Sequence, residues 1–346
     1  MKKLILICVL LFFVASPVYA LDLTAPSAPK DAQGLMRPET NSFGEDLWYI
    51  VKSAVGTLQP QIAKGCAVCL SVIAAAMLTS LLVSFPGKSK RVTELAGTIA
   101  VACLLLGSAN TLIHSAADTV TALSEYGKLL LPVMTTAMAA QGGITSSAAI
   151  YTGTAIFDAI LCALISGLLV PMIYVFLALA VANSALGEDL LKKLRDFLKW
   201  LVSWCLKIIL YVFTGYIAVT GVVSGTTDQA ALKATKLTIS GVVPVVGGIL
   251  SDASEAVLVS AGLVKSAVGV YGLLAIAAIA ITPFLQIAVQ YLLLKLTAAV
   301  CGIFGNKRSS ELIGDFSAAL GLLLAMTGTV CLLLLISTVC FMKGMG

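Results

Sequence analysis

The apolar stretches of this sequence are so long and so poor in charge that they constrain the fold more than any motif does. Residues 129 to 187 carry a single charged side chain, Asp158. Over the whole chain 59% of the residues are hydrophobic and 11% are charged, whereas soluble domains carry about 25% charged residues. Uncharged apolar windows of about 20 residues are typical of membrane-spanning helices. The sequence therefore predicts an all-α fold, a polytopic transmembrane helical bundle that sits in the lipid bilayer.

The first 20 residues have the layout of a secretory signal peptide. Lys2 and Lys3 precede a short apolar run, and small residues lead to a cleavage point after Ala20. A retained first anchor is the alternative, and the shortness of the apolar run argues against it. Cleavage places the mature N-terminus outside the cytoplasm. Residues 21 to 61 then form a short extracytoplasmic segment, too small for a folded domain, which ends in the amphipathic sequence FGEDLWYIVKSAVG.

Two of the apolar segments are too short to cross a bilayer as separate helices. At 1.5 Å per residue, an eleven-residue helix covers about 16 Å of a hydrocarbon core about 30 Å thick. We therefore expect broken helices at membrane depth in both places, within a total of eight to ten spans. The predicted segments are 62–86, 92–114, 129–140 (short), 147–169, 171–186, 200–224, 240–250 (short), 256–281, 283–304 and 316–340.

Three loops are rich in Lys and Arg, a composition that favours the cytoplasmic side of a membrane. They are GKSKR (87–91), EDLLKKLRDFLKW (188–200) and GNKRSSE (305–311). If the mature N-terminus lies outside, the first span places the first basic loop inside. The other two reach the same side only if each short segment acts as a crossing or as half of a paired crossing.

Proline spacing predicts an internal duplication. Pro132 and Pro171 are 39 residues apart, and Pro244 and Pro283 repeat this spacing 112 residues later. In transporters, Gly/Pro-interrupted segments at corresponding places in two halves mark the binding site. The predicted divisions are two leading helices over 62–126, a first repeat unit over 127–224, a connecting loop over 225–239 and a second unit over 240–346.

Few side chains are placed to act within the membrane. A charge at the centre of a span costs about 2.5–3.5 kcal/mol, so an acid or base there needs a partner or a wet cavity. For Asp158, deep in its span, a pathway role and a structural hydrogen-bonded role both fit. Asp252 and Glu255 follow the second broken segment, where they cap a helix start or face a passage. The expected intramembrane polar residues are Asp158, Asp252, Glu255, Lys265 and Lys295, and the broken-helix residues are Pro132, Gly142, Gly143, Pro244, Gly247 and Gly248.

Sequence motifs for catalysis and metal binding are absent. Cys66 and Cys69 form a CxxC within an apolar run, where helix packing is a better explanation than a redox or metal role. His114 is the only histidine and needs other ligands to hold a metal. The sequence contains no GxxxxGKS, HExxH or GxSxG motif. We therefore expect no enzyme activity, no cofactor, no metal and no nucleic acid partner.

The basic segment at 188–200 is amphipathic, with apolar residues at helical spacing. It fits an interfacial helix on the anionic cytoplasmic leaflet. It also fits a docking surface for a cytoplasmic partner, formed by Lys192, Lys193, Arg195 and Lys199. Small residues elsewhere, as in AIAAIAIT (275–282), allow close helix packing. That packing predicts a compact bundle and is compatible with a homo-oligomer.

Three stretches resemble the stage III sporulation protein AE family of endospore-forming bacteria. They are EYGKLLLPVMTTAMAAQGG (125–143), PVVGGILSDASEAVLVSAGLVKSAVGVYG (244–272) and PFLQIAVQYLLLKLTAAVCGIFG (283–305). The resemblance covers about residues 60 to 346. It implies a multi-pass protein of the mother-cell membrane around the forespore. Its partners would be the other stage III sporulation A-operon membrane proteins and their ATPase, in a channel complex that joins the two cells.

Within that complex the resemblance implies a permease-like or scaffolding role in spore development. The main alternative is an independent secondary transporter of a small solute. A purely structural anchor is a third interpretation of the same sequence.

Overall fold

The computed structural model of the chain describes residues 25–37, 42–84, 90–140, 144–219, 267–304 and 307–344. All the regular elements in these ranges are helices. The predicted signal peptide, the connecting loop at 225–239 and the short segment at 240–250 lie outside them.

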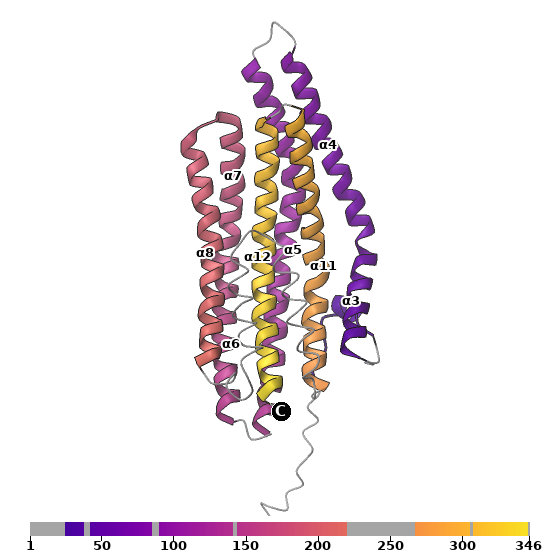
Figure 1. Cartoon of the computed structure of the whole chain (residues 1–346), viewed down its shortest axis with the longest axis vertical. Helices are drawn as coiled ribbons and strands as arrows, with labels where there is room; N and C mark the ends of the chain where they lie inside the picture. Colours follow the sequence, from indigo (N-terminus) through magenta and orange to yellow (C-terminus); the bar gives the residue numbers. More distant parts are fainter. Residues whose placement is uncertain are drawn as a thin grey trace, which may run out of the picture.

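Long helices run side by side along one axis (Figure 1). Six of the described helical stretches are long and apolar enough to cross a membrane, and the predicted all-α polytopic bundle is confirmed. The elements are α2 (Lys30–Gln33), α3 (Phe43–Thr57), α4 (Gln59–Ser84), α5 (Lys90–Ala140), α6 (Ile144–Leu164), the π-helical η1 (Ile165–Leu169), α7 (Val170–Leu186), α8 (Asp189–Val219), α11 (Ala267–Ile303) and α12 (Lys307–Gly344).

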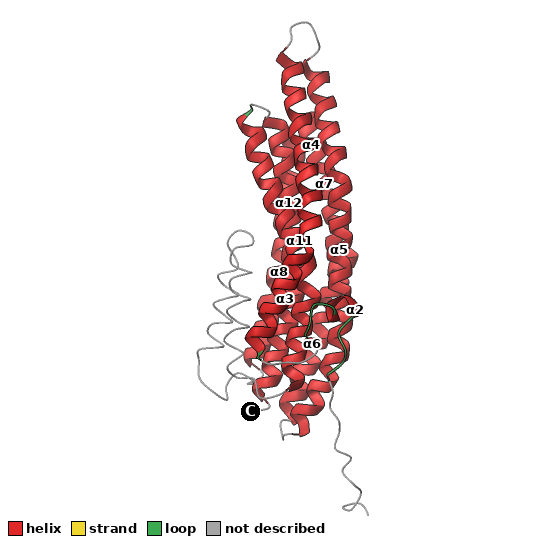
Figure 2. Ribbon diagram, turned by 90° about the vertical axis from the view of Figure 1, so that its right-hand side faces the viewer, coloured by secondary structure: helices red, strands yellow, loops and turns green. Residues whose placement is uncertain are grey.

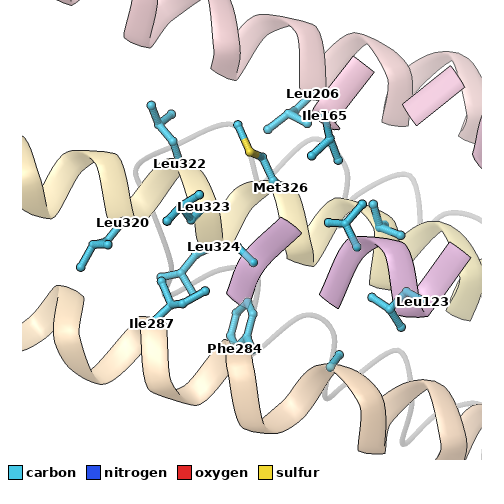
Figure 3. Packing of buried hydrophobic residues seen from close by; sticks show 14 of the residues in the cluster. Leu123, Ile165, Leu206, Phe284, Ile287, Leu320, Leu322, Leu323, Leu324 and Met326 are labelled. Carbon is cyan, nitrogen blue, oxygen red and sulfur yellow. The ribbon is translucent and has the colours of Figure 1, made fainter. Parts of the chain in front are cut away.

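Helix α12 is the centre of the bundle and packs against α5, α6, α7, α8 and α11. In the most apolar 18-residue stretch of α12, 78% of the window is buried, whereas the corresponding value for α4, at the periphery, is 17%. Figure 3 shows Leu320, Leu323 and Met326 of α12 between side chains of neighbouring helices. Helices α11 and α5 are close at Gly272, where a Cβ would lie 2.9 Å from the Cδ atoms of Leu130, so a larger residue would require the Leu130 side chain to shift.

The division of the apolar segments differs from the prediction. The segments 92–114 and 129–140 both lie in α5, which continues without a break through Pro132. Segments 147–169 and 171–186 form one line of helix, in which η1 comes just before Pro171. Pro283 is likewise inside α11. A proline removes one backbone hydrogen bond, and packed neighbouring helices let a membrane helix accommodate it.

The helix ends that flank the three basic loops lie at one end of the bundle, as the charge pattern predicted (Figure 1). Each connects an antiparallel helix pair: α4 with α5, α7 with α8, and α11 with α12. Arg308, at the α11–α12 turn, pairs with Glu94 of α5 at 3.5 Å, and its carbonyl accepts a hydrogen bond from Ser184 of α7. Because residues 129–140 are part of the long helix α5, the turns reach the same end of the bundle without a separate membrane crossing by this segment.

The described parts of the polar segment before the first span are helical and pack on the bundle. Its amphipathic part forms α3, as predicted, and buries Ile50 and Ala54. Both α2 and α3 pack against α11, and the amide of Ala28 hydrogen-bonds the hydroxyl of Tyr271 on that helix. The segment is too small to form its own core, and its helices pack against the apolar surface of α11 instead.

Candidate functional site

Two clusters of buried polar side chains interrupt the apolar interior of the described bundle. One surrounds Asp158, where α6 meets α5 and α12. The other surrounds Arg195, where α8 meets α12 near the basic turns. Because unpaired polar groups are costly inside an apolar core, these two clusters are candidate places for function or helix registration.

Asp158 is 3% exposed and is held by a neighbouring helix. Its Oδ2 accepts a hydrogen bond of 2.6 Å from the hydroxyl of Ser124 on α5. One turn earlier on α6, Thr154 shares a hydrogen bond of 2.5 Å with Ser337 of α12. These bonds connect three helices at one level of the bundle, so the cluster can fix their register.

The second carboxyl oxygen of Asp158, Oδ1, is buried and has no hydrogen-bond partner within the described ranges. An unsatisfied buried acceptor costs about 1–3 kcal/mol. Asp158 therefore has capacity for one more donor or a proton. The sequence identified this residue but gave no indication of Ser124, Thr154 or Ser337, because polar pairing between distant helices leaves no local pattern.

The structure does not bring Lys295 to Asp158. Lys295 is exposed on α11, and its ammonium lies 5.8 Å from the ring centroid of Tyr291, within cation–π range. The remaining proposed pathway and broken-helix residues lie outside the described ranges and stay predictions: Asp252, Glu255, Lys265, Gly142, Gly143, Pro244, Gly247 and Gly248.

The Arg195 cluster divides the predicted docking surface into an inward and an outward part. Arg195 is buried, and its Nη1 donates to Asp315 at 2.5 Å and to Glu311 at 3.4 Å. Its Nε and Nη2 donate to Asp196. Lys192 is exposed and lies 3.9 Å from Glu311, while Lys193 and Lys199 are also exposed. Three of the four predicted docking residues are therefore at the surface, and Arg195 fastens α8 to α12.

The acidic partners of Arg195 are residues that sequence reasoning missed. Glu311 and Asp315 are four residues apart on α12, so both side chains lie on one face of that helix. That spacing was visible in the sequence. The α8 positions opposite them were not, because they depend on how α8 and α12 pack.

The basic segment at 188–200 is the beginning of α8 and not a separate helix on the membrane surface. The side of α8 that carries Val202, Leu206 and Phe213 is buried in the bundle. The opposite side exposes a column of stacked rings, with centroids 5.9 Å apart for Phe197 and Trp200 and 5.7 Å apart for Trp200 and Trp204.

The cysteines and the histidine show no catalytic arrangement in the described helices. Cys66 and Cys69 are free, and Cys69 is buried against the bundle. His114 is exposed on α5. Among the described residues there is no group of three or more His, Cys, Asp or Glu side chains that could hold a metal ion.

Comparison with known proteins connects this bundle to sporulation. The family model for stage III sporulation protein AE matches residues 34–344. Stage III sporulation protein AE of Bacillus subtilis (strain 168) is 24% identical over 203 residues, which cover 59% of this chain and 51% of that relative. The match thus spans about half of the relative's length, and no solved structure matches. The chain belongs to the stage III sporulation protein AE family.

Proposed function

We propose that the chain is an integral membrane component of the sporulation channel complex that links mother cell and forespore, with a scaffolding role in it. The observation that carries this proposal is the family match over residues 34–344. Six long apolar helices support the membrane part of the proposal.

The charge distribution supports an orientation in the mother-cell membrane around the forespore. Short loops rich in Lys and Arg favour the cytoplasmic side, and all three basic turns are at one end of the bundle (Figure 1). The cytoplasmic side would be that of the mother cell. Helix α3 would then lie on the extracytoplasmic side, which faces the gap between the two cells.

The packing of the bundle supports scaffolding over a permease-like role. Helix α12 is enclosed by its neighbours, and Asp158 is hydrogen-bonded between helices. A substrate pathway along these described helices would need a wet, polar lining, whereas the buried side chains around α12 are mainly apolar, with scattered hydroxyl groups such as those of Ser317, Thr327 and Ser337.

The proposed partners are the other A-operon membrane proteins and their ATPase. Lys192, Lys193 and Lys199 are exposed at the proposed cytoplasmic end, where an ATPase would dock. A fixed cationic surface steers association with an acidic partner face. A second copy of the chain is a further proposed partner.

Deletion of the gene in its own organism, with complementation by the intact chain, tests the proposal. We expect the deletion to abolish heat-resistant spores and late forespore gene expression while vegetative growth stays normal. The tagged chain should co-purify with the ATPase from sporulating cells. Normal spore formation after deletion would contradict the proposal. If the purified chain alone moved a solute across vesicles, the independent transporter would be the better explanation.

A further inference from the structure

We propose that lipid acyl chains cover only the part of the bundle next to the basic turns, and that α3 and the distal half of α5 stand in water beyond the opposite membrane surface. The inference rests on the proposed membrane location. The part covered by acyl chains is called the belt, and the exposed side chains of each helix define where it begins and ends.

The boundary between the lipid-covered part and the water-exposed part falls within α5, which is one uninterrupted helix. Next to its basic turn the exposed large side chains are apolar: Val92, Ile99, Leu104 and Leu106. Further along, the exposed face becomes mainly polar, with His114, Asp118, Thr121, Glu125 and Lys128, and Leu129 as the apolar exception. From Val92 to Thr111 the only charged side chain is Glu94, which pairs with Arg308, and the stretch is about 29 Å long, which matches a hydrocarbon core about 30 Å thick.

Helices α4 and α8 also carry parts of the belt. Between Lys64 and Ser84, a length of about 30 Å, α4 has no charged residue. Its exposed side chains there include Leu70, Leu78 and Leu81. On α8 the exposed apolar side chains beyond the charged first turns run from Trp200 to Val212, a length of about 18 Å.

The first half of α11 is apolar but does not face outward. Its residues Leu273, Leu274 and Ile276 are buried, and α2 and α3 cover this half (Figure 2). In the second half, near the basic turn, Leu292 and Leu296 are exposed, with the exposed Lys295 beside them. The outer face of α3 exposes Glu45 and Lys52 beside Trp48 and Val55, a mixed composition that water tolerates.

The belt lies further from the turns on the α6–α8 side. There Ile156 and Ile160 of α6 are exposed, and Asp158 between them meets Ser124 of α5. Ser124 is about 20 Å beyond the end of the α5 belt at Thr111. A bundle tilted from the bilayer normal explains this offset, and Figure 1 shows the α4–α5 hairpin extending beyond the other two turns at the same end.

The three tryptophans report on the two environments. Trp48 on α3 is 69% exposed, and Trp200 and Trp204 within the α8 belt are 53% and 48% exposed. From Trp48 to Lys64 the chain rises about 24 Å along α3 and α4. The headgroup layer beyond the core is only about 5–8 Å thick, so Trp48 lies outside the bilayer.

Fluorescence quenching in vesicles tests the inference on the full chain. The variant Trp200→Phe/Trp204→Phe retains Trp48, and Trp48→Phe retains the α8 pair. Each is reconstituted in phosphatidylcholine with plain or brominated acyl chains, and in plain vesicles with iodide on both sides. We expect brominated chains to quench the α8 pair severalfold more strongly than Trp48, and iodide to show the reverse order.

A matched pair on one helix provides the second measurement. In a background with all three tryptophans changed to Phe, Leu104→Trp should be quenched by brominated chains and Glu125→Trp by iodide. The inference is wrong if brominated chains quench Trp48, or the tryptophan at position 125, as strongly as the belt positions. This result would leave the role in sporulation untouched, because the quenching assay does not depend on partners or on spore formation.

Discussion

Arg195 of α8 and Asp315 of α12 form an ion pair near the basic turns, with side chains that are only 6% and 14% exposed. Glu311 and Asp196 complete the surroundings of the guanidinium. The pair joins the second basic loop to the start of the central helix. Arg195, one of the four residues predicted to form a docking surface, therefore lies in the interior of the bundle.

Replacement of Arg195 by Gln should destabilise the bundle by roughly 3 kcal/mol, because it leaves Asp315 in a largely buried position without its cation. Thermal unfolding of the purified chain in detergent measures the loss. The double variant Arg195→Met/Asp315→Leu should recover most of it, since neither charge then remains. If the single and double variants unfold at the same temperature, the pair does not hold α8 to α12.

The exposed lysines of the same segment should behave in the opposite way. Lys193→Gln/Lys199→Gln should leave the unfolding temperature unchanged, since surface substitutions stay within about 0.5 kcal/mol. If the segment docks the ATPase, co-purification of the ATPase from sporulating cells should fall severalfold. A control is Lys52→Gln, which removes an exposed charge from α3, away from the α7–α8 turn (Figure 1). Undiminished co-purification in the double variant would assign the lysines to the membrane surface alone.

The sequence predicted the fold class and the common end of the basic turns, because both depend on local composition. It did not predict how the apolar segments are joined. The break expected at Pro132 is absent, and the segments expected to divide at Pro171 are joined through η1, because neighbouring helices support the backbone there. The partners of Asp158 and Arg195 come from helices 34 and 120 residues away, and single-sequence patterns carry no signal at such distances.

Two glycines provide a matched test of helix packing. A Cβ at Gly153 of α6 would overlap the ring of Tyr216 on α8, whereas a Cβ at Gly107 of α5 meets nothing within 4 Å. Gly153→Ala should destabilise the bundle by about 1–3 kcal/mol through overpacking. Gly107→Ala should be neutral or stabilise it by up to about 1 kcal/mol, as in a helix interior.

Thermal unfolding in detergent compares the two variants. The second-site change Tyr216→Ala should relieve the overlap in Gly153→Ala, even though it also loses the hydrogen bond from the Tyr216 hydroxyl to the carbonyl of Ala149. Equal unfolding temperatures for the Gly153 and Gly107 variants would show that α6 and α8 are not in close contact at this level.

Variants of Ser124 and Asp158, which share a hydrogen bond, distinguish a structural role of Asp158 from a role in a transport pathway. Asp158→Asn keeps the shape of the side chain and an acceptor for Ser124 but removes the ionisable group. A scaffolding bundle should tolerate this change, with heat-resistant spore counts close to those of the unaltered chain. Ser124→Ala, which leaves a buried carboxyl group without its donor, should cost about 1–3 kcal/mol of stability. Loss of spores in Asp158→Asn, with unfolding temperature and partner co-purification unchanged, would instead show that the acid itself takes part in transport.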